Sequence, residues 1–166
     1  SGNIANSGRL IYSGNNSQTF SGIISGTGAL TKNGSSSLTL SGANSYSGAT
    51  ALNAGTLNIN NATALGTGTF TIAGGTIDNT SGAAITLSNN NTQSWNGDFT
   101  FTGTKDLNLG TGAVAMNYSR VINVAAGNLT VGGAISGSGM GITKNGNGTL
   151  ILSGNNSYTG TTTVNA

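Results

Sequence analysis

The chain of 166 residues holds few side chains suited to catalysis, because it lacks both histidine and cysteine. That absence excludes the usual Ser-His-Asp and Cys-His nucleophiles and most transition-metal sites. The only carboxylates are Asp78, Asp98 and Asp106. A glycoside hydrolase needs two acids facing one cleft, so an enzyme would require Asp98 and Asp106 to meet, for example beside Arg120. The alternative interpretation is that these acids serve turns and face water, and we expect no catalytic residues.

Glycine-rich stretches resemble binding loops only superficially. A calcium-binding β-roll repeats Gly-Gly-x-Gly-x-Asp, and the pairs Gly74-Gly75 and Gly132-Gly133 lack that aspartate. The stretch Gly26-Thr27-Gly28 resembles a nucleotide loop, but the residues after it do not favour a helix. We therefore expect no metal site and no cofactor.

Four aromatic residues fall at comparable places in similar segments, each after a run rich in Asn and Ser. They are Phe20, Tyr46, Trp95 and Tyr158. An exposed row of such rings would bind sugars by stacking. The structural interpretation is that the rings fill a core otherwise made of small residues. We favour the structural interpretation and keep glycan stacking as the alternative.

Composition narrows the class of protein. Only 5% of residues are charged, the net charge is +2, and the five basic residues are scattered along the chain. A nucleic-acid binder carries clustered Lys and Arg, so no nucleic acid is expected as a partner. No apolar stretch is long enough to be a transmembrane segment. The 29 glycines, with abundant Ser, Thr and Asn, disfavour helices and predict short strands joined by tight turns.

Short apolar-x-apolar triplets recur along the chain and predict strands with one buried face. A sandwich or antiparallel barrel would show longer strands and hairpin signals, whereas brief strands with small-residue corners are typical of a β-helix. An all-β fold, a single-stranded parallel β-helix or solenoid, is therefore predicted. The triplets lie at 38–40, 57–59, 70–72, 85–87, 99–101, 107–109, 129–131 and 150–152.

A long internal repeat supports the solenoid. Residues 31–54 read TKNGSSSLTLSGANSYSGATALNA, and residues 143–166 read TKNGNGTLILSGNNSYTGTTTVNA. The two segments align without a gap, so that Thr31 corresponds to Thr143. With coils of about 22 residues, the offset between the copies would equal about five coils and the chain would hold about seven.

The repeat resembles the autotransporter passenger-associated β-strand repeat. The resemblance is carried by Gly28–Leu57 in one copy and Gly141–Ala166 in the other, whereas residues 60–86 and 110–128 match it poorly. It implies a right-handed β-helix in the passenger of a Gram-negative type V secretion protein, exposed at the cell surface or released. The family motif carries no catalytic residues.

These observations lead to one main hypothesis and several alternatives. Residues 1–166 are predicted to form a single β-helical segment, a fragment of a longer surface protein. It would act as a rigid stalk or binding scaffold, and its partners would be host or cell-surface glycans or proteins. Alternatively, the chain polymerises through its coil ends into an extracellular filament or matrix fibre. A glycan-active β-helix enzyme and an ice-binding β-helix are further alternatives.

Overall fold

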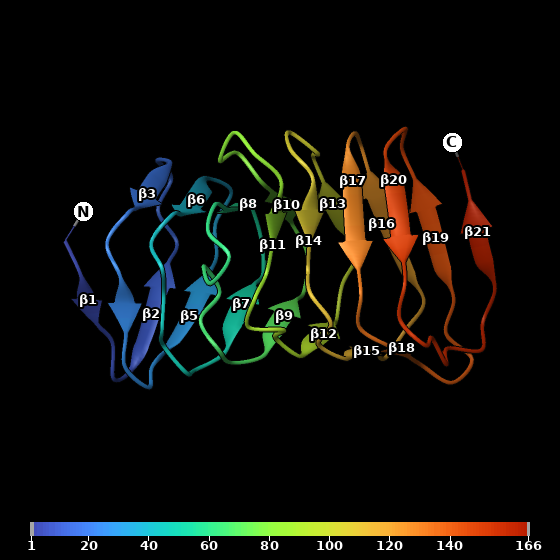
Figure 1. Ribbon diagram of the computed structural model, residues 1–166, viewed down its shortest axis with the longest axis horizontal. Helices are drawn as coiled ribbons and strands as arrows, with labels where there is room; N and C mark the ends of the chain where they lie inside the picture. Colours follow the sequence, from blue (N-terminus) through green and yellow to red (C-terminus); the bar gives the residue numbers. More distant parts are fainter. Residues whose placement is uncertain (1, 166) are drawn as a thin grey trace.

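The computed structural model describes residues 2–165 and shows a β-solenoid with parallel strands (Figure 1). The predicted segment is thus covered except for Ser1 and Ala166, which lie outside the described residues. No helix occurs within residues 2–165, and hence none that could cross a membrane. The two ends of the chain lie at opposite ends of the solenoid (Figure 1).

Each turn of the solenoid has three faces. On face 1, two short sheets contain β1 (Ile4–Ala5) and β4 (Ile24–Ser25), and β11 (Ile85–Thr86), β14 (Leu107–Asn108), β17 (Asn128–Val131) and β20 (Thr149–Leu152). Face 2 contains β2 (Arg9–Tyr12), β5 (Ala29–Lys32), β7 (Thr50–Leu52), β9 (Phe70–Ile72), β12 (Gln93–Trp95), β15 (Val114–Met116) and β18 (Ile135–Ser136). Face 3 contains β3 (Gln18–Phe20), β6 (Ser37–Leu40), β8 (Thr56–Ile59), β10 (Thr76–Asp78), β13 (Phe99–Phe101), β16 (Arg120–Val124), β19 (Ile142–Asn145) and β21 (Thr162–Val164).

The eight strands of face 3 define eight turns, one more than the estimated seven. The register explains the difference, because the turns are uneven and several are shorter than the coil assumed for the estimate. The shortest step on face 3 runs from Leu38 to Leu57, and the longest runs from Thr76 to Thr100. The predicted parallel β-solenoid is confirmed, and every predicted triplet overlaps a strand.

Alternation along the strands builds the core. In β6, Leu38 and Leu40 are fully buried while Thr39 between them faces outward and is partly exposed. Each inward residue packs on its register partner one turn away, as Leu38 does on Leu57. The core is therefore a continuous apolar column along the solenoid axis, and the strand edges between turns are closed by backbone hydrogen bonds.

The two sequence repeats occupy different faces. Strands β5 and β6 of the first copy belong to faces 2 and 3, whereas their equivalents β19 and β20 belong to faces 3 and 1. The offset between the copies therefore equals five turns plus one face. The estimate of about five coils was therefore close but did not include the shift by one face. The shift is possible because two different pairs of neighbouring faces accept the same strand-corner-strand sequence.

Candidate functional site

All three carboxylates accept a hydrogen bond from a backbone N–H of the following turn. Asp98 directly precedes β13 on face 3, and Asp106 directly precedes β14 on face 1. Asp98 Oδ1 accepts a hydrogen bond of 2.8 Å from the backbone N–H of Val121. Asp106 accepts bonds of 2.9 and 2.8 Å from the backbone N–H and the side-chain amide of Asn128. These two hydrogen bonds hold the pKa of Asp106 below its ordinary value, and the bond from the side-chain amide has the larger effect.

Arg120 does not join the acids at one site. Its Nε donates to the Trp95 carbonyl at 2.8 Å, and its Nη2 donates to Asn117 at 2.5 Å. Asp98 lines a shallow hollow on face 3 with Val121 and other residues, but neither Asp106 nor Arg120 lines it. The buried Asp78 accepts bonds from Thr104 through both carboxylate oxygens. Within residues 2–165, no three metal-ligating side chains cluster.

The four predicted aromatics come from all three faces and do not form one row. Trp95 and Tyr46 have no exposed surface, so neither ring offers a face on which a sugar could stack. Trp95 lies edge-on to Phe99, with their ring centroids 5.3 Å apart. Phe20 and Tyr158 belong to the first and last turns, and both pack partly buried against the core. Tyr118 has an exposed ring, which is 67% accessible and lies against the Arg120 guanidinium. This tyrosine was not among the four aromatic residues predicted from the sequence.

The tyrosine of the repeat closes a buried polar pair. The Tyr46 hydroxyl lies 2.5 Å from Thr50 Oγ1, which in turn donates to the Leu65 carbonyl at 3.0 Å. In the second copy, Tyr158 and Thr162 form the same pair at 2.7 Å. Burial raises the pKa of Tyr46 to about 12, because a phenolate would be poorly solvated there.

This raised pKa predicts alkaline instability. Below pH 10 the folded and unfolded states both keep the Tyr46 proton, whereas between pH 10 and 12 only the folded state keeps it. Stability should therefore fall with rising pH in this window, by up to roughly 2–3 kcal/mol. Urea unfolding of wild type and Tyr46→Phe at pH 8 and 11.5 would test this. A wild-type loss no larger than that of Tyr46→Phe would contradict it.

The lysine of the repeat is buried at a corner and binds carbonyl oxygens. Lys32 Nζ donates to the carbonyls of Asn33, Gly34 and Ala54, at 2.7, 2.9 and 3.1 Å. The first two carbonyls belong to the same corner, and Ala54 belongs to the corner one turn later. Burial lowers the pKa of Lys32, and the three carbonyl bonds offset the cost of desolvating its charge.

The second repeat reproduces this corner. Lys144, also buried, donates to the Gly146 carbonyl, the equivalent of Gly34. The side-chain amide of Asn165 donates to Asn145 Oδ1 at 3.0 Å, as Asn53 does to Asn33 at 2.8 Å. The position equivalent to Ala54 is residue 166, outside the described residues. The repeat is therefore a corner unit whose polar residues tie one turn to the next.

Replacing Lys32 with methionine tests the corner. The methionine keeps most of the apolar stem but leaves three enclosed carbonyls without their ammonium donor. The free energy of unfolding should fall by about 1–3 kcal/mol. Lys105→Met is the matched control, because Lys105 is exposed. This substitution should change the free energy of unfolding by less than about 0.5 kcal/mol. Equal or higher stability of Lys32→Met in urea unfolding would show that the buried charge costs more than its bonds contribute.

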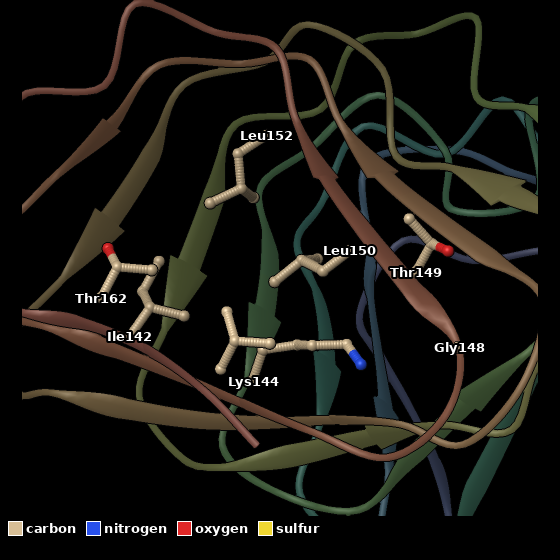
Figure 2. A pocket seen from close by; sticks show the side chains of 8 residues that line it. Ile142, Lys144, Gly148, Thr149, Leu150, Leu152 and Thr162 are labelled. Atoms are coloured by element: carbon tan, nitrogen blue, oxygen red, sulfur yellow. The ribbon is translucent and has the colours of Figure 1, made fainter. Parts of the chain in front are cut away.

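The C-terminal end of the solenoid is an open apolar hollow of about 290 Å³ (Figure 2). Ile142, Leu150, Leu152 and Thr162 point into it, and the Lys144 side chain crosses one side (Figure 2). In the first repeat, the equivalent surface is covered by β8 and β9 of the following turn. The hollow is thus an inter-turn surface of the solenoid that no further turn covers among the described residues.

The repeat units match a known family. A passenger-associated-transport-repeat model matches residues 30–59 and 142–166, which are the two copies of the corner unit. No curated protein and no solved structure matches the chain. The resemblance inferred from the sequence is therefore confirmed for the two repeats.

Proposed function

From the two passenger-associated-transport repeats that the chain carries, we propose that it is a structural segment of a bacterial passenger, secreted or displayed at the cell surface. Its role is mechanical, as a stiff rod. Recognition of glycans or proteins on a host or another cell belongs, in this proposal, to regions that the rod holds away from the cell. The chain's part is to supply length and stiffness.

The observation that carries the proposal is the unbroken stacking of eight turns. Strands on face 3 pair in sequence from β3 to β21, and inward residues form one apolar column. Where face 1 lacks strands, backbone bonds continue the ladder, as from Ser47 to Gly26 at 2.9 Å and from Thr67 to Tyr46 at 2.9 Å. A rod with ladders on three sides resists bending, because bending must stretch hydrogen bonds on at least one face.

Corner bonds add stiffness between turns. Lys32, Asp98 and Asp106 each bind atoms of a neighbouring turn. The charged side chains are thus used for holding turns together instead of forming a catalytic cluster. This use of scarce charges favours a structural role.

Inserting turns tests the rod. Residues 30–49 form one register unit, because Leu30 pairs with Thr50. Three tandem copies inserted after residue 49 should lengthen the particle by about 14 Å, since each turn adds about 4.8 Å. Small-angle X-ray scattering would measure the maximum dimension.

A control insertion that breaks the register tests whether whole turns are required. Three copies of residues 30–39 add half-units that cannot restore the pairing of Leu30 with Thr50. This variant should lose cooperative unfolding, whereas the full-turn variant keeps it. A full-turn variant that unfolds, or keeps the wild-type length, would overturn the proposed rod.

A further inference from the structure

Four asparagines of the chain are followed directly by glycine. Such an asparagine can lose its side-chain amide in an intramolecular reaction, because the glycine nitrogen lies close to the side-chain carbonyl carbon and no Cβ hinders it. The rate depends on whether that nitrogen is free and on how strongly the carbonyl is polarised. The pairs are Asn33-Gly34, Asn96-Gly97, Asn145-Gly146 and Asn147-Gly148.

In two of these pairs the glycine nitrogen is already used by the fold. The Gly97 N–H donates to the Ile72 carbonyl at 3.0 Å, and the Gly148 N–H donates to the Val124 carbonyl at 2.8 Å. Each nitrogen would have to break a hydrogen bond between turns before it could attack. The glycine nitrogens of the other two pairs have no acceptor among the described residues, so they are free to react.

Lys32 activates the nitrogen of the first free pair. Its buried Nζ donates to the Asn33 carbonyl at 2.7 Å. This carbonyl belongs to the same peptide group as the Gly34 nitrogen. A positive charge on the peptide oxygen stabilises the anion that remains when the nitrogen loses its proton. The effect is strengthened because the ammonium is shielded from water.

The side-chain carbonyl of Asn33 is polarised from the next turn. Asn53 Nδ2 donates to Asn33 Oδ1 at 2.8 Å. When the Gly34 nitrogen adds to the Asn33 Cγ, negative charge develops on this oxygen, and the donor already in place stabilises it as in an oxyanion hole. Within residues 2–165, Asn33 Nδ2 donates no hydrogen bond of its own, so the fold does not hold the leaving nitrogen.

We infer that Asn33 is a site of self-catalysed deamidation, in which the Gly34 nitrogen is the nucleophile. Lys32 activates this nitrogen, and Asn53 supplies the oxyanion donor. The Gly34 N–H gives its proton to water, the nitrogen bonds to the Asn33 Cγ, and Nδ2 takes a proton from water and leaves as ammonia. A water molecule then opens the succinimide at either carbonyl and gives aspartate or isoaspartate. This inference does not rest on the proposed rod function.

The second repeat has only half of this arrangement. Asn165 Nδ2 donates to Asn145 Oδ1 at 3.0 Å, as in the first copy. Lys144, however, donates to the carbonyl of Gly146 and not to that of Asn145, and the structure describes all three residues. Asn145 should therefore react more slowly than Asn33. Each event replaces a neutral amide with a carboxylate beside a buried lysine, so the first one lowers the net charge from +2 to +1.

Peptide mapping by mass spectrometry would measure all four rates in one folded sample. Heavy-oxygen water labels every newly formed carboxylate. Asn33 should react at least about tenfold faster than Asn96 and Asn147, with Asn145 between them. In urea the four pairs should react at similar rates, because no contact then distinguishes them. A folded chain in which Asn33 reacts no faster than Asn96 and Asn147 would overturn the inference.

Two substitutions test the activating groups separately. Lys32→Met removes the cation, and Asn53→Ala removes the oxyanion donor. Each should slow the reaction at Asn33 at least about tenfold and leave the rate at Asn96 unchanged. Lys105→Met replaces an exposed lysine and is the matched control, so it should change neither rate.

Asn96 also reports whether a variant has opened, because opening would speed up Asn33 and Asn96 together. An undiminished rate at Asn33 beside a slow Asn96 in Lys32→Met would show that the lysine does not activate the pair. Asn53→Ala keeps the test decisive if Lys32→Met opens the corner. An unchanged rate at Asn33 in Asn53→Ala would likewise overturn the inference.

Discussion

Trp95→Ala should lower the free energy of unfolding by about 3–5 kcal/mol, among the largest effects of any single substitution in this chain. Trp95 is fully buried on β12, between its register partners Ile72 and Met116. Its indole N–H donates to Gln93 at 3.2 Å. Truncation leaves a large cavity in the middle of the solenoid and removes that donor. Urea unfolding followed by circular dichroism would measure the loss.

Tyr118→Ala is the matched control, because that ring is 67% exposed at a corner. Its stability should stay within about 0.5 kcal/mol of wild type. If Trp95→Ala also stayed within that range, Trp95 would not be a core residue, and the burial described above would be contradicted.

Gly103→Ala should lower the free energy of unfolding by about 2–5 kcal/mol for two separate reasons. Gly103 has a φ of +80°, which strains any residue with a Cβ. A Cβ at this position would also lie 1.8 Å from the Ala126 carbonyl oxygen of the next turn. Because backbone cannot move aside without opening the ladder, the clash adds to the strain.

Gly82→Ala separates the two causes. Gly82 has a φ of +95°, but a Cβ at this position would meet no atom within 4 Å. Its substitution should therefore cost only the backbone strain, about 1–2 kcal/mol. Equal losses for the two variants in urea unfolding would show that the close approach of turns at Gly103 contributes nothing.

The local pattern was enough to predict the strands and the architecture. Alternation in segments such as Leu38-Thr39-Leu40 depends only on neighbouring residues, so the sequence displays it directly. The phase of the repeat could not be predicted in the same way. The segments at 31–54 and 143–166 are closely similar, yet they lie on different faces because five turns plus one face separate them. The number of residues in each turn is set by corner loops that follow no simple pattern.

The polar part of the repeat was harder to predict. Lysine is usually exposed, so burial of Lys32 and Lys144 had no direct signal beyond their common place before Asn-Gly. Their carbonyl partners come from corners, which the sequence shows only as Gly- and Asn-rich runs. The sequence shows which residues are acidic but not where they lie in the solenoid. Only the fold shows that Asp98 and Asp106 precede strands of different faces.

The three-faced solenoid places its two repeats five turns and one face apart. Because the chain lacks cysteine, pairs of spin labels can be introduced cleanly at exposed residues. Ser35 and Ser138 lie at the same corner, five turns apart, whereas Ser35 and Asn147 are equivalent residues of the two repeats.

Double electron–electron resonance would measure both distances. We predict about 24 Å for Ser35 to Ser138, from five turns of about 4.8 Å, and about 30 Å for Ser35 to Asn147, which also crosses a face. Equal distances, or a shorter one for the repeat-equivalent pair Ser35 and Asn147, would contradict the arrangement.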